Sequence, residues 1–547
     1  MKFIRLVLFL LASLIASSPM RAQAPESYRG LLTSQVRSGK MVSPEHLRSY
    51  IKDGKLSLSL REAVLLMLEN NSNIRVEETQ VEAQKFTLLG AHQPFDPLLT
   101  SSINLNRYSS PGYSQLQGVG QSTTSTLNSL TQTGQISYTQ TFVTGTNIVA
   151  SISSSKSSTN SSFNYFNPYF NSLVSFQFTQ PLLRNAGRFA NTAPLIIARR
   201  TLQQSRASFA GQVNDSILQV VQQYWIAVQA RGSLDVNRES LKLAESSYAR
   251  DKRALELGAL PPLDIYRSES EVAARKVQII QSEFALTQAE EALRLAIGAE
   301  QAPEFRALEF DLTEKPQSDG PLESVDAATV LAAALDHRPE IEVTKDALAI
   351  DDVGIRLAKN HLKPDLSLTG FYQSNGLGGN QYNLVTGQLV APGGFGSSFG
   401  QVFGFNSPGY GGTLTLNLPV RNGGAQANLG SALVSRSHDA YSGRQIQEQI
   451  TQEVSLTIHQ FEEAKLALAA GGVSFDLAQK SLAADQRKYE LGAETNFFVL
   501  DSQTRLAQAE LVLLQTQVNY KIALAALGHA TGDLLDPYHV KIDDLSK

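Results

Sequence analysis

Two long stretches of the chain place hydrophobic residues at alternating steps of four and three, the spacing of one face of a coiled helix. They lie within residues 188–257 and 424–491. Each is followed by a run in which apolar residues recur every seven positions, a repeat that underwinds helices into a left-handed supercoil. The pattern predicts two coiled hairpins whose outgoing helices have about 65 residues, or about 100 Å if unbroken.

The apolar positions of the outgoing stretches are Val213, Ile217, Val220, Tyr224 and Ala227 in the first copy, and Ile450, Val454, Thr457, Phe461, Ala464 and Leu468 in the second. Those of the return stretches are Ile265, Val272, Ile279, Leu286 and Leu293, then Val499, Leu506, Leu513, Tyr520 and Leu527. Breaks at Gly232 and at Gly471-Gly472 are compatible with the pattern.

Two other segments alternate apolar and polar residues, as strands with one face of each kind do. They lie at about 98–181 and about 366–419, and together they predict about four strands per chain. The first segment is the longer one, and either an added hairpin around 134–155 or longer loops would account for the difference. Alternation is clearest at Val174, Phe176 and Phe178 and at Leu414, Leu416 and Leu418.

The same two segments are almost free of charge. Between Pro97 and Leu183 the only charged residues are Arg107 and Lys156, and residues 366–420 contain none. Such a division into charge-poor and charged segments is typical of a chain of which one part lies in a membrane. Four strands are fewer than the eight of the smallest membrane barrels, and open sheet edges are not tolerated in lipid. We therefore expect several chains to share one barrel in a symmetric oligomer.

The chain repeats itself. Glu256-Leu-Gly-Ala259 returns as Glu490-Leu-Gly-Ala493, and the residues around both copies align without a gap. We expect a first repeat at 58–300, a linker at 301–325 and a second repeat at 326–532. Each repeat reads as an opening helix, strands, a long helix, a tight turn and a return helix. The tight turns fall at about 256–262 and about 490–496.

The first opening helix has a recognisable start and end. Ser59 and Glu62 form the spacing of a capping box, and the helix is predicted to run to about Gln93, where Pro94 and Pro97 stop it.

The N-terminus has the features of an export signal. Basic residues precede an apolar run and an A-x-A cleavage site, so residues 1–24 are predicted to be a signal peptide. Residues 25–57 form a polar lead-in to the first repeat, which we expect in the periplasm, and 533–547 form a C-terminal tail.

Composition gives little support to catalysis, cofactors or nucleic-acid binding. The chain has no cysteine, and without Lys2, Arg5 and Arg21 its formal net charge changes from −4 to −7. The eight histidines lack metal-ligand spacing, and no Gly-x-Ser-x-Gly elbow occurs. We expect no enzyme, cofactor or metal site.

The chain resembles the TolC family of outer-membrane efflux proteins from Leu58 to Gly532. No single motif is specific, but their order, their duplication and the signal peptide in front of them make the set strong. The motifs that carry the resemblance are Leu58-Ser-Leu-Arg-Glu-Ala-Val64, Asn70-Asn71, Gln180-Pro-Leu-Leu183, Arg338-Pro-Glu340, Pro364-Asp-Leu-Ser-Leu368 and the two Leu-Gly-Ala turns.

The resemblance implies a fold and a role. Its fold class is a mixed α and β membrane protein with a periplasmic α-barrel and a transmembrane β-barrel shared by a homotrimer. Three chains would give twelve strands in the outer-membrane lipid and a twelve-helix tunnel. A periplasmic adaptor would dock on the tunnel, with an inner-membrane transporter beneath, and the chain would be a passive exit duct for a tripartite efflux pump or type I secretion system.

The resemblance also assigns site residues. Adaptor docking falls on the hairpin turns, which here are Leu257, Gly258 and Ala259 and Leu491, Gly492 and Ala493. A plain helix connection, in which the glycine ends the helix, would fit the same residues.

The family's gate and entrance positions correspond to Asp264, Tyr489, Glu494 and Asp501. Glu494 stands where the family has an arginine, so the usual closing ion pair cannot form. A solvated helix face remains the alternative for the acidic positions.

A secreted coiled-coil filament or adhesin is the alternative function. It would account for the heptads but not for the uncharged, alternating segments between proline stops.

Overall fold

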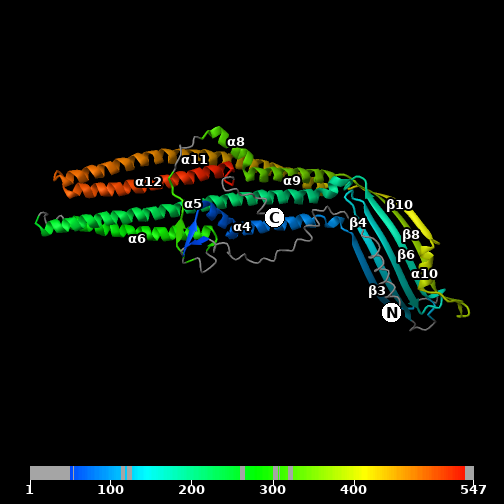
Figure 1. The fold of residues 1–547 in the computed structure, drawn as a ribbon. Coiled ribbons are helices and arrows are strands. Elements are labelled where there is room, and N and C mark those ends of the chain that lie inside the picture. Colours follow the sequence, from blue (N-terminus) through cyan, green and yellow to red (C-terminus); the bar gives the residue numbers. More distant parts are fainter. Residues whose placement is uncertain are drawn as a thin grey trace. The chain divides into compact units, whose positions relative to one another are not determined.

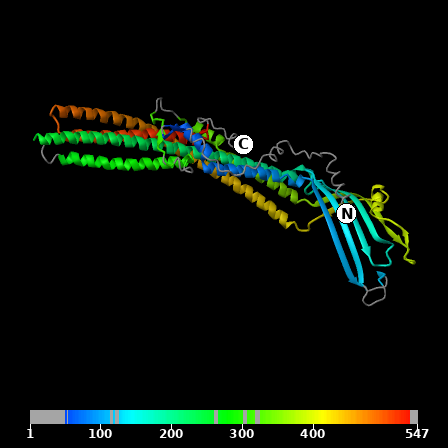
Figure 2. The ribbon, with the colours of Figure 1, turned by 60° about the horizontal axis from the view of Figure 1, so that its bottom comes forward.

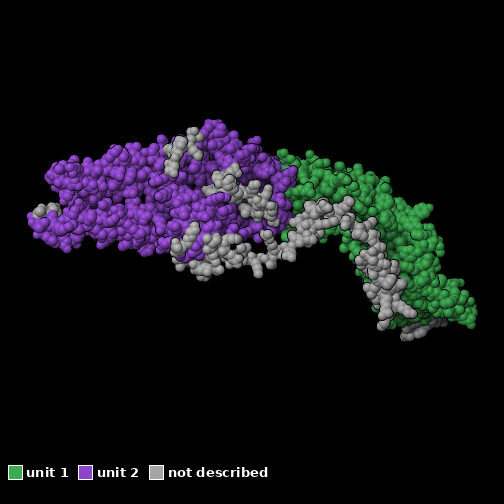
Figure 3. Space-filling view, viewed as in Figure 1, with its two compact units in different colours: residues 1–37, 86–199, 349–436 green, residues 38–85, 200–348, 437–547 purple. Residues whose placement is uncertain are grey.

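The computed structural model describes residues 50–52, 54–112, 117–119, 126–258, 265–299, 306, 308–317 and 325–535. The chain forms two compact units, coloured separately in Figure 3. The first contains residues 86–199 and 349–436 and holds the large sheet, and the second contains residues 38–85, 200–348 and 437–547 and is mainly helical. The predicted signal peptide lies outside the described residues. No described helix is both long and apolar enough to cross a membrane.

The first unit is built on one antiparallel sheet (Figure 1). Its strands lie in the order β10-β8-β6-β5-β4-β3, and the short β9 pairs with β8. Both end strands, β3 and β10, have one edge that pairs with no other described strand. The bounds are β3 Leu98–Pro111, β4 Thr126–Thr141, β5 Asn147–Thr159, β6 Phe166–Pro181, β8 Asp365–Tyr382, β9 Leu389–Ala391 and β10 Pro408–Asn417.

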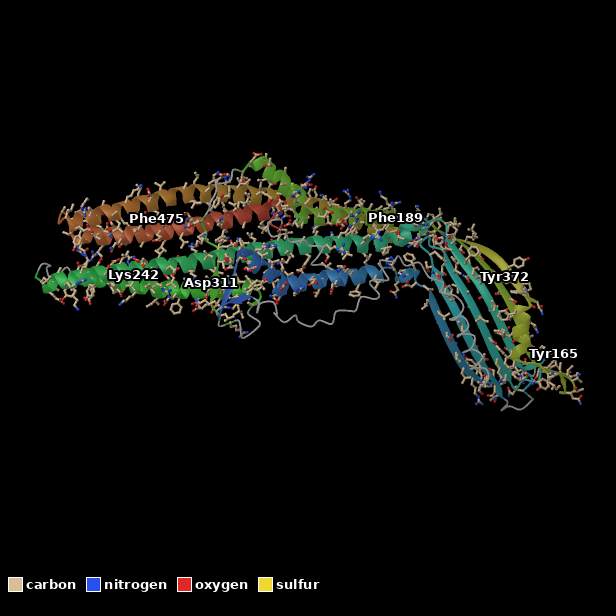
Figure 4. The ribbon with its side chains drawn as sticks, viewed as in Figure 1. Tyr165, Phe189, Lys242, Asp311, Tyr372 and Phe475 are labelled. Atoms are coloured by element: carbon tan, nitrogen blue, oxygen red, sulfur yellow. The ribbon has the colours of Figure 1, made fainter. Side chains whose placement is uncertain are left out.

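The register gives the sheet one apolar and one polar face, because residues paired across antiparallel strands lie on the same face. Ile136, Ile152 and Val174 pair in one row of the apolar face. Tyr372, labelled in Figure 4, pairs with Phe176 on that face. The polar face carries a ladder of hydroxyls bonded across strands, with Oγ–Oγ distances of 2.7 Å for Ser151–Ser175, 3.1 Å for Thr179–Thr369 and 3.3 Å for Thr131–Ser157.

The prediction of about four strands was wrong, because the sheet has six long strands. The difference is the hairpin β4–β5, which settles the question left open for residues 134–155: the extra length of the first segment forms a hairpin within the sheet. The sequence signal was weak because β4 is rich in Ser, Thr and Gln on both faces and alternates clearly only near Ile136 and Tyr138.

A short uncharged helix, α10 (Phe395–Phe403), packs on the apolar face. The Ser374 hydroxyl donates to the Val402 carbonyl at 2.7 Å, and the hydroxyls of Ser172 and Ser398 are 2.8 Å apart. Gly376 leaves room for the helix, since a Cβ there would lie 1.9 Å from the Ser398 carbonyl oxygen. Residues 374–412, which are rich in Gly, Ser and Asn, thus include this helix, β9 and parts of β8 and β10.

Two helical hairpins dominate the second unit, and their helices lie side by side in Figures 1 and 2. They are α5 (Arg188–Glu256) with α6 (Ile265–Ala296), and α11 (Gly423–Glu490) with α12 (Asn496–Thr531). Neither outgoing helix breaks at its glycines. Gly232 and Gly471 instead permit close packing, since a Cβ on Gly232 would lie 2.7 Å from Leu514 Cδ2 and one on Gly471 would lie 2.9 Å from Thr516 Oγ1.

The predicted heptad positions of α5 and α11 are buried, apart from the half-buried Leu468. On the return helices the predicted stripe is mostly half-buried, and the fully buried stripe consists of mostly small residues three positions after it. Small side chains let neighbouring helices approach closely, and together the two stripes complete the a and d positions of a coiled coil. The second stripe consists of Ser268, Arg275, Ser282, Ala289 and Ala296 in α6, and Ser502, Ala509, Thr516, Ala523 and Ala530 in α12.

The opening helix of each repeat is split in two. The first breaks at Asn71, between α3 (Leu60–Asn70) and α4 (Ser72–Gly90), where a single helix to about Gln93 was predicted. The Asn71 amide donates to the Ala296 carbonyl at 3.0 Å, and its oxygen accepts from Asn73 N at 2.8 Å. The predicted capping box of Ser59 and Glu62 is confirmed. The second repeat breaks at Arg338, between α8 (Ala327–His337) and α9 (Pro339–His361).

The lead-in and the linker, far apart in sequence, pair with each other. β2 (Lys55–Leu58) lies parallel to β7 (Phe310–Leu312) and antiparallel to β1 (Ile51–Lys52). The buried Tyr224 hydroxyl donates to the Leu58 carbonyl at 3.1 Å, which ties this small sheet to α5.

Candidate functional site at the hairpin ends

Both outgoing helices end in a glycine with left-handed backbone, and each glycine follows an exposed leucine. Gly258 and Gly492 have φ of 72° and 73°, and Leu257 and Leu491 are 84% and 69% exposed. At the second turn Gly492 N donates to the Tyr489 carbonyl and Ala493 N to the Lys488 carbonyl, which is a Schellman cap. Ala259 and Asp264 lie outside the described residues.

The glycines are required by backbone geometry but not by local crowding. A Cβ on either would meet nothing within 4 Å, so the only cost of a side chain is the left-handed conformation itself. The structure therefore supports the plain helix-cap role directly and leaves open space around each turn.

Glu494 has an ion-pair partner within its own hairpin. Lys488 Nζ lies 2.8 Å from Glu494 Oε1 and 3.4 Å from Asp485 Oδ1. The hydrogen bond and charge of Glu494 raise the pKa of Lys488. The Ser502 hydroxyl, which bonds Asp485 at 2.5 Å, is the main cause that lowers the pKa of Asp485. The acidic substitution is thus neutralised locally by a lysine six residues earlier.

The other two described gate residues, Asp501 and Tyr489, have separate contacts. Asp501 pairs with the exposed Arg505 one turn later, at 2.9 Å. Tyr489 is half-buried and contributes its carbonyl to the helix cap.

A buried carboxylate that the sequence reasoning missed joins the ends of α5 and α12. Asp251 is 5% exposed, and the Asn496 amide donates to both of its oxygens at 2.9 and 2.8 Å. A signal existed in the internal repeat, because Asp251 aligns with Asp485 in the segment before each turn. The repeats diverge at the partner, because the position that holds Asn496 in the second copy is Pro262 in the first.

A second missed contact joins α6 and α12. Arg275 interrupts the small-residue stripe and is buried, with its guanidinium on Glu271 and its Nη2 donating to Thr504 Oγ1 at 2.7 Å. Its counterpart in the second repeat is Ala509. Comparing the two copies at this heptad position would have revealed it, because one copy has a small residue and the other a cation.

A third polar cluster explains the Arg338-Pro-Glu340 motif. Arg338 is 8% exposed and contacts Glu340 at 2.8 Å and Glu453 at 2.7 Å. His529 Nε2 lies 2.8 Å from Asp215. Burial alone would lower the pKa of His529, but its hydrogen bonds to Asp215 and Glu453 outweigh burial and raise the pKa to about 9. The cluster links residues of α5, α9, α11 and α12.

The comparisons with known proteins agree with this architecture. The family model described as "Outer membrane efflux protein" matches residues 146–299 and 330–533, more than half of the chain. The antibiotic efflux pump outer membrane protein ArpC of Pseudomonas putida is 24% identical over 311 residues, or 56% of this chain and 58% of that protein. The outer membrane efflux protein BepC of Brucella suis is 24% identical over 206 residues, or 37% and 40%. Both matches span less than two thirds of the relative's own length.

A solved structure shows the same fold. The Campylobacter jejuni CmeC outer membrane channel matches with a TM-score of 0.61 at 14% identity, over 94% of each chain. Identity that low shows a shared fold and no more. The family match is decisive, because it reaches into both repeats. The chain is a member of the family of outer membrane efflux proteins, whose fold and outer-membrane location the sequence resemblance predicted.

Proposed function

We propose that the chain is the outer-membrane exit duct of a tripartite efflux pump or type I secretion system and works as a homotrimer. The observation that carries the proposal is the sheet of the first unit. It has one apolar face, one hydroxyl-rich face and two edges left unpaired by the described residues. In lipid, such edges must be paired, and a barrel closed by further copies pairs all of them.

The strands fit a membrane crossing. A tilted transmembrane strand needs about 9–11 residues. The shortest of the six long strands, β10, has 10 residues and the longest, β8, has 18. Exposed side chains on the apolar face include Ile103, Leu105, Leu414 and Leu416. Outer-membrane lipid is the proposed partner of this face.

The helices also have faces suited to further copies. Val277, Ile280 and Phe284 form an exposed apolar row on α6, and Leu466, Val473 and Leu477 form another on α11. The residues of each row are spaced along one helix face. Two such rows on one chain support a closed ring in which α6 of one copy packs against α11 of the next.

The hairpin turns are the proposed docking surface for a periplasmic adaptor protein. Leu257 and Leu491 are exposed, and the glycines beside them leave space for a helix of the partner to approach. An inner-membrane transporter beneath the adaptor would supply the energy, because a duct does no work of its own. The similar protein ArpC is named as part of an efflux pump, and this supports the proposal that the chain works with an adaptor and a transporter.

The closed state is proposed to rest on contacts between the two hairpins near their ends. These are the Asp251–Asn496 and Arg275–Thr504 hydrogen bonds. Glu494 is bound to Lys488 in its own hairpin and would not close the duct as the family's arginine does. Asp264, Tyr489 and Asp501 keep their predicted gate or entrance role as part of the proposal.

Membrane fractionation and the mass of the detergent-solubilised particle test whether the chain is a trimeric duct. A duct needs detergent for extraction and has the mass of three chains in the detergent micelle. A coiled-coil adhesin would be released by salt or shed. A monomer in detergent, or a chain that stays in the soluble periplasm, would overturn the proposal.

Cross-linking tests the docking surface. The chain has no cysteine, so single cysteines placed at Gly258 or Gly492 report without background. Each should cross-link to an adaptor in cells, whereas a cysteine at the exposed Ala285, on the side of α6 and outside its apolar row, should not. Failure at both turns would remove the docking assignment while leaving the duct intact.

A further inference from the structure

The extra hairpin β4–β5 is fixed into the sheet. Its turn, between Thr141 and Asn147, lies against the connection from β6 to α5. Gly187 N donates to the Thr144 carbonyl at 3.2 Å, and Thr146 donates to the Gln180 side chain. Gly145 has φ of 85°, and a Cβ there would lie 2.8 Å from the Asn185 carbonyl oxygen. Such contacts hold the hairpin in one position.

Both faces of the hairpin continue the faces of the neighbouring strands. Ile136 and Ile152 extend the apolar row of Val174, and Ser137 and Ser151 extend the polar row of Ser175. Pairing is unbroken between β3 and β4, between β4 and β5, and between β5 and β6. A hairpin that plugged a lumen or lay on the surface would not share this register. It is therefore part of the barrel wall.

We infer that three copies close a barrel of eighteen strands, six from each chain, with a lumen wider than the twelve strands implied by the resemblance would give. The inference rests on the proposed homotrimer. With strands about 4.8 Å apart and tilted by about 40°, eighteen strands give a backbone diameter of about 36 Å, against about 24 Å for twelve. The cross-section of the lumen is then roughly 2.3 times larger, because diameter grows almost linearly with strand number.

The lumen wall is also nearly uncharged. The polar face consists of Ser, Thr, Asn, Gln and Gly with a few apolar residues, and Asp365 at the first position of β8 is its one charged residue among the described strands. Arg107 and Lys156 lie on the opposite face, paired with Leu130 and Phe170. Selection by charge needs charged rings along the path. The barrel thus admits bulky cargo of either charge, and selection by size or charge falls to the hairpin ends.

Electron cryomicroscopy of the detergent-purified trimer tests the strand count directly. Eighteen strands in a closed wall support the inference. Twelve strands in a trimer, with β4–β5 outside the wall, would overturn it and leave the proposed duct standing. A particle that is not a trimer would instead remove the proposed function on which the inference rests.

Cysteine labelling in proteoliposomes tests the hairpin without a structure. Ser137→Cys and Ser151→Cys should react with a water-soluble maleimide, and Ile136→Cys and Ile152→Cys should not. Equal reaction of both sets would show that the hairpin is outside the wall.

Deletion gives the functional test. A chain in which a short turn replaces residues 112–165 joins β3 to β6 and leaves four long strands. If it assembles, its conductance, with the hairpin ends cross-linked open in both proteins, should fall, by at most about twofold because the helical tunnel in series with the barrel is unchanged. An unchanged conductance would contradict the wider lumen, and if the variant does not assemble, the labelling and the strand count decide.

Discussion

At the scale of single residues, the contact between the ends of the two hairpins depends on a buried carboxylate, Asp251, and on the side-chain amide of Asn496 that donates to it. Asp251 is almost fully buried, and Asn496 donates to both of its oxygens. The other side-chain atom of Asn496, Oδ1, is buried without a partner in the described chain. A buried carboxylate is tolerated only while its hydrogen bonds last, because water cannot replace them without opening the site.

Removing the amide should therefore loosen the hairpin ends. In Asn496→Ala, the Asp251 carboxylate loses its donors while still buried, at a cost of about 2–4 kcal/mol. Hydrogen exchange of residues 490–505 should accelerate accordingly. The matched control is Asp501→Ala, whose exposed pair with Arg505 is worth less than about 1 kcal/mol. Equal exchange in both variants would refute the role of the buried pair.

The cluster at His529 makes a pH-dependent contribution to stability. The folded pKa of His529, about 9, lies above the 6.5 of a histidine side chain in water. The stabilisation is therefore fully present below about pH 6.5 and is lost as the pH rises through about 9. A shift of this size corresponds to at most about 3 kcal/mol, and to less because Asp215 is largely exposed.

Exchange of amides near His529 should speed up between pH 7 and 10 beyond the intrinsic effect of pH on exchange. His529→Gln should be less stable than the parent at pH 6 and should lack this extra acceleration. Parallel profiles in the two proteins would contradict the assignment.

At the scale of elements, the glycines within the long helices are packing residues. Two neighbours offer a matched comparison. A Cβ on Gly471 would meet Thr516, whereas one on Gly472 would meet nothing within 4 Å. Gly472→Ala should stabilise by about 0.5–1 kcal/mol through helix propensity alone. Gly471→Ala should destabilise, since the clash falls on a β-branched residue that cannot move away. Thermal unfolding of the two variants in detergent should shift in opposite directions, and shifts of the same sign would disprove the packing role.

The sequence predicted the helices and strands best where the periodicity of their hydrophobic residues is strong. The heptads predicted continuous long helices and their buried faces, and the capping box marked the first helix. The breaks at Asn71 and Arg338 were not predictable from local pattern, because each depends on contacts with residues far along the chain, Ala296 and Glu453. The hairpin β4–β5 was only partly visible, since Ser, Thr and Gln occupy both of its faces.

The candidate site was predicted less completely than the fold. The turns at Gly258 and Gly492 were found because they are duplicated and because a left-handed glycine has a sequence signature. Asp251 and Arg275 were missed because both look like solvated helix residues until the second hairpin packs against them. Local sequence does not encode that packing, although a comparison between the repeats points to both positions.

At the scale of the whole molecule, the exposed apolar rows on α6 and α11 should be subunit contacts. Phe284→Glu places a charge in the α6 row and should reduce the trimer fraction by tenfold or more, since burying an unpaired charge costs several kcal/mol. Ala285→Glu, which places the same charge on another exposed face of α6, is the control. Light scattering of detergent-purified protein measures the mass. A stable trimer of Phe284→Glu would exclude this face from the interface.

The hydroxyl ladder on the polar face of the sheet has a consequence for transit. Ser151 bonds Ser175, and Thr179 bonds Thr369, so these hydroxyls are already engaged with one another across the strands. A molecule moving along such a wall meets hydroxyls that are already paired and, apart from Asp365 at the start of β8, no charge to hold it. Each contact is then shallow and brief, and passage through the barrel proceeds at close to the rate of free diffusion.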